Sequence, residues 1–222
     1  LYLANLAQVN EQLQQQLELE QVDSILIIAM MTRLRQICCE PRMLYENYKG
    51  ESTKFTMCLE LIETLKENGK KVLLFSSFTS IFDSFIEEFN QRGIKYHMIT
   101  GAVDKKKRKE EVDAFQSDDS DVFLISLKAG GTGLNLTKAQ AVIHYDPWWN
   151  VSAQNQATDR AYRIGQTKNV LVYQLLMKNT IEAKIYEMQK RKKEMSDIFV
   201  DNSNGGISTL SKEELRDLFS ME

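Results

Sequence analysis

Residues 121–136 read DVFLISLKAGGTGLNL, an apolar run followed by a loop that carries three glycines in four positions. An apolar run of this length, bounded by turn residues, predicts a buried strand. Similar runs lie at 71–75, 95–99, 141–145 and 170–176, and helical patterns with short connections separate most of them. Strands that alternate with helices indicate βαβ units. We therefore predict an α/β fold with a parallel sheet flanked by helices.

Helical patterns precede and follow this alternating region, which extends over residues 51–180. Residues 1–50 carry two stretches with apolar residues at helical spacing, and then a polar connection. Residues 181–222 carry a long helical stretch, a linker at 201–208, and a short last helix that a capping box at Ser211–Glu214 opens. The prediction is a helical segment leading into the sheet region, and further helices after it.

The composition is that of an ordinary folded protein, because 43% of the 222 residues are hydrophobic and 27% are charged. This excludes an intrinsically disordered chain, and no apolar stretch reaches the roughly 18 residues of a transmembrane helix. The net charge of −3 excludes a globally basic nucleic-acid binder, but it permits a local basic patch. Since the chain opens at Leu1 without Met, we expect a fragment of a longer protein or a processed piece.

Cysteine and histidine are sparse in this chain. The three cysteines, Cys38, Cys39 and Cys58, form no C-x-x-C pair, and His97 and His144 are the only histidines. This pattern argues against a disulfide framework and against a zinc or histidine metal site, and it indicates a reducing compartment. We expect no metal site built by this chain alone.

The glycine-rich loop is the first candidate for chemistry. Glycines let backbone amides come close to an anion or a sugar, and Thr132 adds a hydroxyl donor. A glycine cluster by itself favours a flexible turn. The loop is not a phosphate-binding P-loop, which needs G-x-x-x-x-G-K-[ST], because the one Gly-Lys pair, Gly69-Lys70, is followed by lysine.

The second candidate is the string QATDRAYRIGQ at residues 156–166. Arg160 and Arg163 are three residues apart, so they share one face if the stretch is helical. Two forked guanidiniums on one face suit a polyphosphate whose charge spreads as its terminal bond breaks. The alternative is a solvated arginine face paired with Asp159, and the neighbouring glycine and glutamines argue against it.

The third candidate is DPWWN at residues 146–150. Adjacent tryptophans point in different directions, so at least one should lie off the core. An exposed tryptophan near a basic loop indicates contact with nucleic acid or with a protein partner. The alternative, that both rings are core aromatics, is as good an account for Trp149 and a poorer one for Trp148.

Taken together, the string from Ser126 to Gln166 closely resembles the second half of the Swi/Snf-type family of DNA translocases, in helicase superfamily two. The family pattern is S/T-x-K-A-G-G-x-G-L-N-L, then D-P-W-W-N, then Q-A-x-x-R-x-x-R-x-G-Q. Leu127 stands where the family usually has threonine or serine, and Val151 where it usually has proline. The compact connections look more like a bacterial member than a nuclear remodeller.

Other segments are similar to the family as well. Residues 31–43 look like its helical approach to the second lobe, and 71–78 like the first element of that lobe. Thr100-Gly101, with Arg108 beyond it, looks like the following element. The helix predicted from residue 181 is similar to the family's brace helix. The resemblance implies a RecA-like sheet with a helical N-terminal approach and C-terminal brace helices.

The resemblance also implies a motor whose ATP site lies between two lobes. The P-loop and the Asp-Glu element that hold ATP and Mg²⁺ belong to the family's first lobe, and this chain has neither. The chain is therefore expected to be the C-terminal half of a DNA-dependent ATPase, inactive when isolated. The family's arginine fingers carry over to Arg160 and Arg163. The nucleotide-lining positions carry over to Gly131, Thr132, Gly133 and Gln156.

Double-stranded DNA is the main partner that the resemblance implies, along with the first lobe of the same protein. The DNA-facing positions carry over to Ser77, Thr100, Arg108, Lys128, Asn135 and Trp148. RNA polymerase or another DNA-bound protein is a further possible partner, and no membrane is expected. The basic run Lys105–Lys109 is better explained as a solvated helix face neutralised by Glu110 and Glu111, except for Arg108, which matches the family.

Two other classes stay open. The lobe could belong to an RNA-directed or strand-separating helicase, which the DPWWN and RIGQ strings disfavour. It could also be a partner-docking module whose motor motifs are relics, which the retained arginine pair disfavours. The expected location is the cytoplasm, with the nucleoid, for a bacterial protein and the nucleus for a eukaryotic one.

Overall fold

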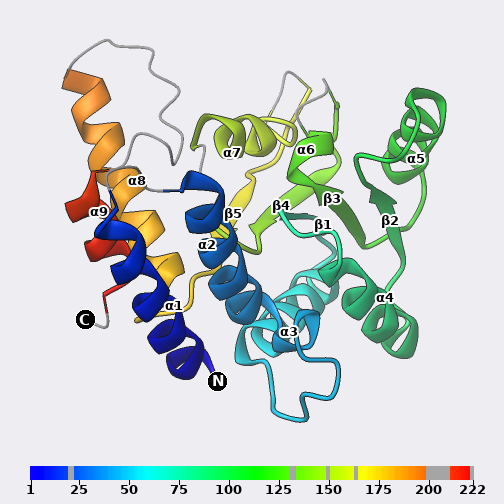
Figure 1. Ribbon diagram of the computed structural model, residues 1–222. Coiled ribbons are helices and arrows are strands. Elements are labelled where there is room, and N and C mark those ends of the chain that lie inside the picture. Colours follow the sequence, from blue (N-terminus) through cyan, green and yellow to red (C-terminus); the bar gives the residue numbers. More distant parts are fainter. Residues whose placement is uncertain (20–22, 131–133, 149–150, 163–164, 199–210, 221–222) are drawn as a thin grey trace. The chain divides into compact units, whose positions relative to one another are not determined.

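The computed structural model describes residues 1–19, 23–130, 134–148, 151–162, 165–198 and 211–220 (Figure 1). The chain folds into two compact units. The sheet unit is Glu51–Leu175, and the helical unit combines Leu1–Gly50 with Leu176–Glu222.

The sheet unit contains a five-stranded parallel sheet, which confirms the predicted fold class. The spatial order is β2-β3-β1-β4-β5. The strands are β1 (Lys71–Ser76), β2 (Tyr96–Ile99), β3 (Val122–Ser126), β4 (Ala139–His144) and β5 (Leu171–Gln174). Every strand runs in the same direction, so all five carboxyl ends lie along one edge of the sheet.

The central strands are apolar throughout because they are covered on both faces. All five residues of β3 and the last five of β1 are buried. In register, Leu74 of β1 lies between Leu124 of β3 and Ile143 of β4. The edge strand β5 begins with two exposed residues, Leu171 and Val172. Burial therefore falls from the centre of the sheet toward this edge.

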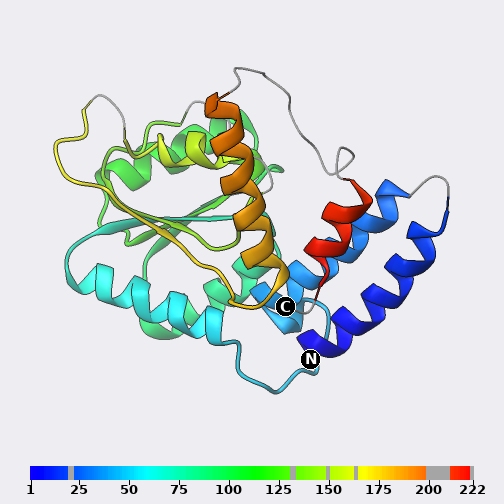
Figure 2. The same ribbon diagram turned by 90° about the vertical axis from the view of Figure 1, so that its left-hand side faces the viewer.

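Among the described residues of this unit, the helices that accompany the strands are α3 (Thr53–Glu67), α4 (Ile81–Arg92), α5 (Lys105–Ser117), α6 (Leu127–Gly130) and α7 (Val151–Thr158). They cover both faces of the sheet (Figure 2). On one face, Phe115 of α5 and Ala157 of α7 share a core cluster with Phe75 and Phe123.

The opposite face of the sheet is covered by α3 and α4. Phe55 of α3 lies 4.7 Å from Phe85 of α4 between ring centroids, and Phe85 meets the edge of Tyr145 at 5.3 Å. Helix α4 ends at Gly93, whose φ of 61° is left-handed, a conformation that glycine adopts without a steric penalty. This turn starts the short return to β2.

The helical unit consists of α1 (Tyr2–Leu17), α2 (Ser24–Cys39), the 3₁₀ turn η1 (Pro41–Met43), α8 (Ile181–Ile198) and α9 (Lys212–Leu218). Asp23 caps α2 by accepting from two backbone amides, and Ser211 and Glu214 form the predicted capping box of α9. Helices α1 and α2 pack together, and α8 packs on α2 and α9. Within the described residues, no helix is long and apolar enough to cross a membrane.

Candidate functional site

The carboxyl edge of the sheet places four loops side by side. Near the carboxyl edge the strands are in register, with Ile99 beside Ile125, Ile125 beside Phe75, and Phe75 beside His144. The loops that follow β2, β3, β1 and β4 therefore begin next to one another in that order. Since neighbouring strands are about 4.8 Å apart, this row of loops is about 14 Å long. In open parallel sheets, ligands bind at this edge.

The row brings together several positions that the sequence singled out. Thr100 begins the loop after β2, Lys128 lies in α6 after β3, Ser77 follows β1, and Trp148 lies in the loop after β4. Thr100 and Ser77 are half-buried. The side chain of Lys128 lies outside the described residues, as do Gly131, Thr132, Gly133, Trp149 and Arg163.

Asp146 joins the loop after β4 to the loop after β1. Its carboxylate is fully buried and accepts from the Ser76 hydroxyl at 2.7 Å and from the Ser77 amide at 3.0 Å. It also accepts a hydrogen bond from the Ser77 hydroxyl. The Ser76 hydroxyl in turn accepts from the Phe78 amide at 3.1 Å. A buried carboxylate is expensive without donors, so these bonds hold the two loops in one arrangement.

This arrangement changes how Ser77 is interpreted. The sequence predicts a residue that faces DNA, whereas the structure directs its hydroxyl to Asp146. A ligand must therefore compete with Asp146 for this hydroxyl. The predicted role of Ser77 remains a prediction, and Asp146 becomes the residue that fixes the loop. Sequence reasoning treated Asp146 as part of a tryptophan motif and missed its own contacts.

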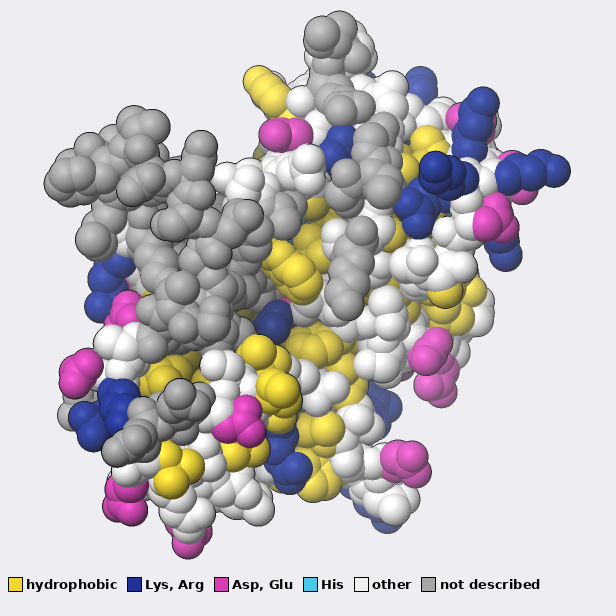
Figure 3. All heavy atoms as spheres, turned by 45° about the horizontal axis from the view of Figure 1, so that its top comes forward, with side chains coloured by type: hydrophobic (Ala, Val, Ile, Leu, Met, Phe, Trp, Pro, Cys, Tyr) yellow, Lys and Arg dark blue, Asp and Glu magenta, His cyan; other side chains and the backbone are white. Residues whose placement is uncertain are grey.

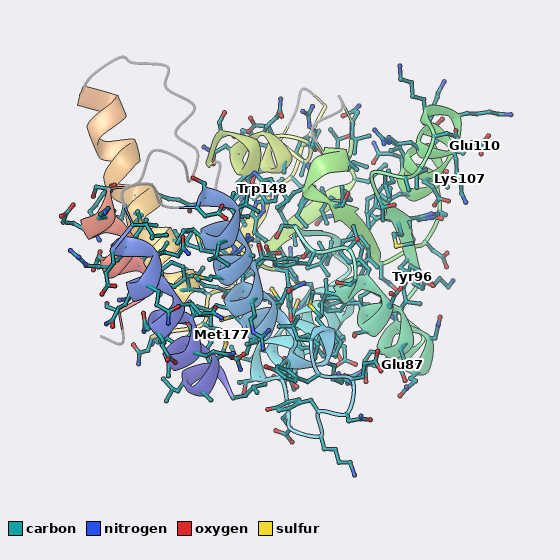
Figure 4. All side chains as sticks on the ribbon, in the orientation of Figure 1. Glu87, Tyr96, Lys107, Glu110, Trp148 and Met177 are labelled. Atoms are coloured by element: carbon teal, nitrogen blue, oxygen red, sulfur yellow. The ribbon has the colours of Figure 1, made fainter. Side chains whose placement is uncertain are left out.

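Trp148 is half-buried and packs against the core cluster under α7 (Figure 4). Its backbone amide donates to the Gln154 side-chain oxygen at 3.2 Å. Gln154 lies on α7, so this bond connects the loop after β4 to that helix. Trp148 is thus neither a fully buried core residue nor a fully exposed one.

His144 of β4 forms a hydrogen bond with the last residue of α7, Thr158. Its ring is 1% exposed, stacks on Phe75, and its Nε2 lies 2.8 Å from the Thr158 hydroxyl. Thr158 donates to the Gln154 carbonyl at 3.3 Å, so it accepts from a protonated Nε2. Burial lowers the pKa of His144 to about 4, although the nearby Asp146 charge opposes the shift. The ring is therefore neutral at pH 7.

Arg160 lies in the turn that follows α7, which ends at Thr158. The sequence argument for a shared face applies only if the stretch is helical, and Arg163 lies outside the described residues. The Arg160 side chain is 4% exposed, and its carbonyl accepts from the Leu136 amide at 3.0 Å. Its predicted role as an arginine finger remains a prediction.

Gln156 and Asn135 are exposed, whereas Gln166 is used internally. The Gln166 amide nitrogen donates to the carbonyls of Thr137 and Ala139 at 2.9 Å each, and to that of Ala161 at 3.2 Å. Gln166 therefore fastens the turn after α7 to the start of β4. Asn135 lies between two buried leucines, which leaves its polar side chain on the surface.

Lys54 is a second residue that sequence reasoning missed. It is 3% exposed on α3, and its ammonium lies 4.9 Å from the centroid of the Tyr145 ring. Tyr145 directly precedes Asp146, so this cation–π contact supports the same loop from the opposite face of the sheet. A buried lysine in the first turn of a helix gives no periodic signal in the sequence.

Helix α5 follows the loop after β2. Asp104 caps it by accepting from the amides of Lys106 and Lys107, and Arg108 is half-buried with Nη2 donating to the Val103 carbonyl at 3.2 Å. The lysines of this helix are exposed.

Metal ligands do not gather in the described part of the chain, where no group of three or more His, Cys, Asp or Glu side chains is placed to hold an ion. Cys38, Cys39 and Cys58 are buried and unpaired by disulfides. Burial raises the pKa of the Cys58 thiol, an effect that nearby Lys54 opposes. These thiols are therefore parts of the core.

The family model of the helicase conserved C-terminal domain matches residues 53–165. An "Uncharacterized ATP-dependent helicase" of Mycoplasma pneumoniae is 39% identical over 91% of this chain and 20% of its own length. The "Putative ATP-dependent helicase/translocase YwqA" of Bacillus subtilis is 37% identical over 88% of this chain and 22% of its own length. The chain therefore spans about a fifth of the curated relatives that it matches.

Solved structures give the same result. The Sulfolobus solfataricus SWI2/SNF2 ATPase core in complex with dsDNA matches all of this chain over 47% of its own, with a TM-score of 0.80 and 29% identity. The C-terminal domain of that ATPase matches all of this chain over 93% of its own, with a TM-score of 0.79 and 26% identity.

Proposed function

Because this chain belongs to the helicase C-terminal domain family, as the RecA-like second lobe of the Swi/Snf type, we propose that it forms half of an ATP-dependent motor that moves along double-stranded DNA. The single observation that carries the proposal is the row of loops at the carboxyl edge, with Asp146 joining two of them. The structural relative in complex with dsDNA supports duplex DNA as the track.

The nucleotide is bound between two lobes in this proposal, and this chain supplies one wall. Arg160 and Arg163 are the proposed arginine fingers, and Gln156 with the glycine-rich loop lines the nucleotide. Exposed Gln156 fits such a surface, whereas Arg160 is buried, so this role requires its guanidinium to become accessible to a phosphate. Hydrolysis of the terminal phosphoanhydride bond of ATP drives the motor in this proposal. An upstream lobe would hold most of the nucleotide, together with Mg²⁺. In this proposal, none of the described acidic residues of this chain is a ligand of the Mg²⁺ ion.

The DNA backbone is contacted by the row of loops. Thr100, Arg108, Lys128, Asn135 and Trp148 offer hydroxyl, cationic, amide and ring surfaces to sugars and phosphates. Contacts of this kind carry little information about the DNA sequence, and the binding affinity that they provide falls as the salt concentration rises. Asp146 keeps the loops after β1 and β4 in fixed relation, so both advance together when the lobe moves.

The experiment is ATP hydrolysis by the complete protein with duplex DNA, single-stranded DNA or RNA, and with this chain alone as a control. We expect an inactive isolated chain and a complete protein stimulated chiefly by duplex DNA. Stimulation chiefly by RNA would move the protein to the RNA-directed class. A folded complete protein without turnover would favour a docking module.

The arginine-finger assignment has its own test in the same protein. Arg163→Ala should lower turnover by about 10³- to 10⁵-fold, the range typical of an arginine finger, while duplex binding stays nearly intact. Fluorescence anisotropy of a labelled duplex measures the binding. A parallel loss of DNA binding would contradict the assignment and make Arg163 a DNA contact or a structural residue.

A further inference from the structure

Four exposed lysines form a basic surface on the first half of α5. We call Lys105, Lys106, Lys107 and Lys109 the α5 lysine patch. Figure 3 shows Lys and Arg side chains projecting from this end of the molecule, and Figure 4 labels Lys107 with its neighbour Glu110. Arg108 is half-buried within the same stretch and is not counted in the patch.

Of the acidic residues near this surface, two have other partners, and Glu110 lies one turn along the same helix without an ion pair in the described residues. Glu111 lies 2.6 Å from His97 Nδ1, and Asp104 accepts from backbone amides at the start of the helix. Where the chain is described, none of the four patch ammoniums forms an ion pair, and neither does Glu110. The sequence favours a solvated helix face neutralised by Glu110 and Glu111, and that interpretation stays open: the lysines are exposed, and neither glutamate forms an ion pair with them in the described residues.

The lysines are also poorly placed for the stability of α5. The start of a helix carries a partial positive charge, so anions stabilise it and cations are repelled. Three of the four patch residues, Lys105, Lys106 and Lys107, occupy the first turn. Asp104 compensates only through its bonds to the backbone. The charge therefore contributes little to the fold and is available for an external polyanion.

The position of the patch indicates which polyanion. It begins one residue after the loop that contains Thr100, and β2 is an edge strand of the sheet. The patch therefore lies at the outer end of the row of loops. A row of about 14 Å matches about four phosphates of one strand at about 3.4 Å of helix axis each. A duplex lying along the row continues past β2 toward α5.

From this placement we infer that the α5 lysine patch binds phosphates of the duplex beyond those contacted by the row of loops. The inference rests on the proposed function, since it needs duplex DNA at the carboxyl edge. The patch adds affinity without sequence preference, because lysine contacts phosphates as a point charge. It lengthens the footprint of this lobe on the DNA.

The test measures how duplex binding by the complete protein depends on salt. The patch variant is K105Q/K106Q/K107Q/K109Q, which removes the charges, keeps polar side chains and leaves Arg108 in place. The control is K70Q/K95Q/K138Q/K168Q, which removes four lysine charges near the amino ends of the strands, one of them, Lys95, paired with Asp119. A six-residue strand separates the two edges by about 20 Å, beyond the Debye length of about 10 Å at 0.1 M salt.

Binding to a labelled duplex is followed by anisotropy between roughly 50 and 200 mM salt. Each lost phosphate contact should flatten the slope of log K against log salt by about 0.9, so two to four contacts flatten it by roughly 1.8 to 3.6. The control should keep the wild-type slope. An unchanged slope in the patch variant, or equal flattening in the control, would overturn the inference.

The same samples separate this inference from the proposed function. Duplex-stimulated ATP turnover in the wild type with an unchanged slope in the patch variant would overturn the inference alone. Absence of duplex stimulation in the wild type would overturn the proposed function, and the inference with it. Flattening seen with duplex RNA and not with duplex DNA would also overturn it.

Discussion

Two aspartates at opposite edges of the same sheet are held in different ways. Asp146, at the carboxyl edge, is fully buried and accepts from serine hydroxyls and a backbone amide. Asp118 lies at the amino edge, where its side chain is 39% exposed and is bonded to Lys71, His97 and Ser120. One carboxylate is enclosed by protein, and the other remains in contact with water.

The contrast separates a positioning role from a fastening role. The donors around Asp146 are the last residue of β1 and the first residue of the loop after it, so its geometry decides where that loop starts. The partners of Asp118 fasten the end of α5 to the sheet, since Lys71 also donates to the Phe115 and Asp118 carbonyls at 2.6 and 2.9 Å. Water can replace part of the second set of bonds but little of the first.

Removing the buried carboxylate should have the largest effect. Asp146→Ala leaves hydroxyl and amide donors without an acceptor, which should lower the free energy of unfolding by about 2–4 kcal/mol. Displaced loops should reduce duplex-stimulated turnover by about 10- to 100-fold. Urea unfolding and ATPase assays on the complete protein measure both, with Ser77→Ala as a milder companion. Normal turnover per folded molecule would refute the positioning role.

Low pH should destabilise the protein through His144, which lies two residues before Asp146 at the carboxyl edge of the sheet. Its pKa is about 4 when folded and about 6.5 when unfolded, so the unfolded state binds the proton more readily. The contribution of neutral His144 to the free energy of unfolding is about 3 kcal/mol. It is fully present above pH 6.5 and is lost as the pH falls toward 4. His144→Gln, which keeps a donor toward Thr158, should flatten this loss. Identical pH profiles for the variant and the wild type would contradict the assignment.

At the amino edge, Asp118→Asn should cost only about 1 kcal/mol at pH 7, because the side chain is partly exposed and its ion pairs are screened. Burial opposes ionisation, but bonds from Ser120, His97 and Lys71 outweigh it and hold the pKa of Asp118 well below its usual range. The contribution is present above the unfolded pKa of about 3.9 and is lost as the pH falls below it. ATP turnover should not change, and a change would give Asp118 more than a fastening role.

The smallest expected effect is a difference in how the stabilities of the Asp118 and Asp146 variants depend on salt. Raising ionic strength from 0.1 to 1 M shortens the Debye length from about 10 to about 3 Å. The destabilisation caused by Asp118→Asn should shrink by a few tenths of a kcal/mol, and that caused by Asp146→Asn should stay the same. Chemical unfolding in urea at both salt concentrations measures this. Equal salt sensitivity would remove the distinction between the edges.

The sheet was predictable from sequence because its signals are local. Each buried strand is an apolar run, and the capping box at Ser211 and Glu214 is also a short-range pattern. Contacts between distant segments gave no such signal. Asp146 bonds residues about 70 positions earlier, and Glu111 turns to His97 on a neighbouring strand instead of to a lysine on its own helix.

The nucleotide side shows the same limit. The spacing of Arg160 and Arg163 is meaningful only on a helix, and Arg160 already lies in the turn beyond α7. Ala157 and Ala161 are buried in the core cluster, and the Gln166 amide donates to three backbone carbonyls around the turn after α7. These tertiary contacts outweigh the local helical pattern of the sequence at Arg160. A single sequence records the residue types of the site, but it does not record which segments hold them.

The central place of β1 has a consequence for how this protein is made. Its two neighbours are β3 and β4, which begin about 50 and 70 residues later, so no hairpin can form it early. During synthesis the run KVLLFS must remain without its partner strands until Ser126 has left the ribosome. Pairing across such long loops is slow and leaves apolar strand edges open to aggregation. Chaperone demand should therefore peak while the middle of this chain is being translated.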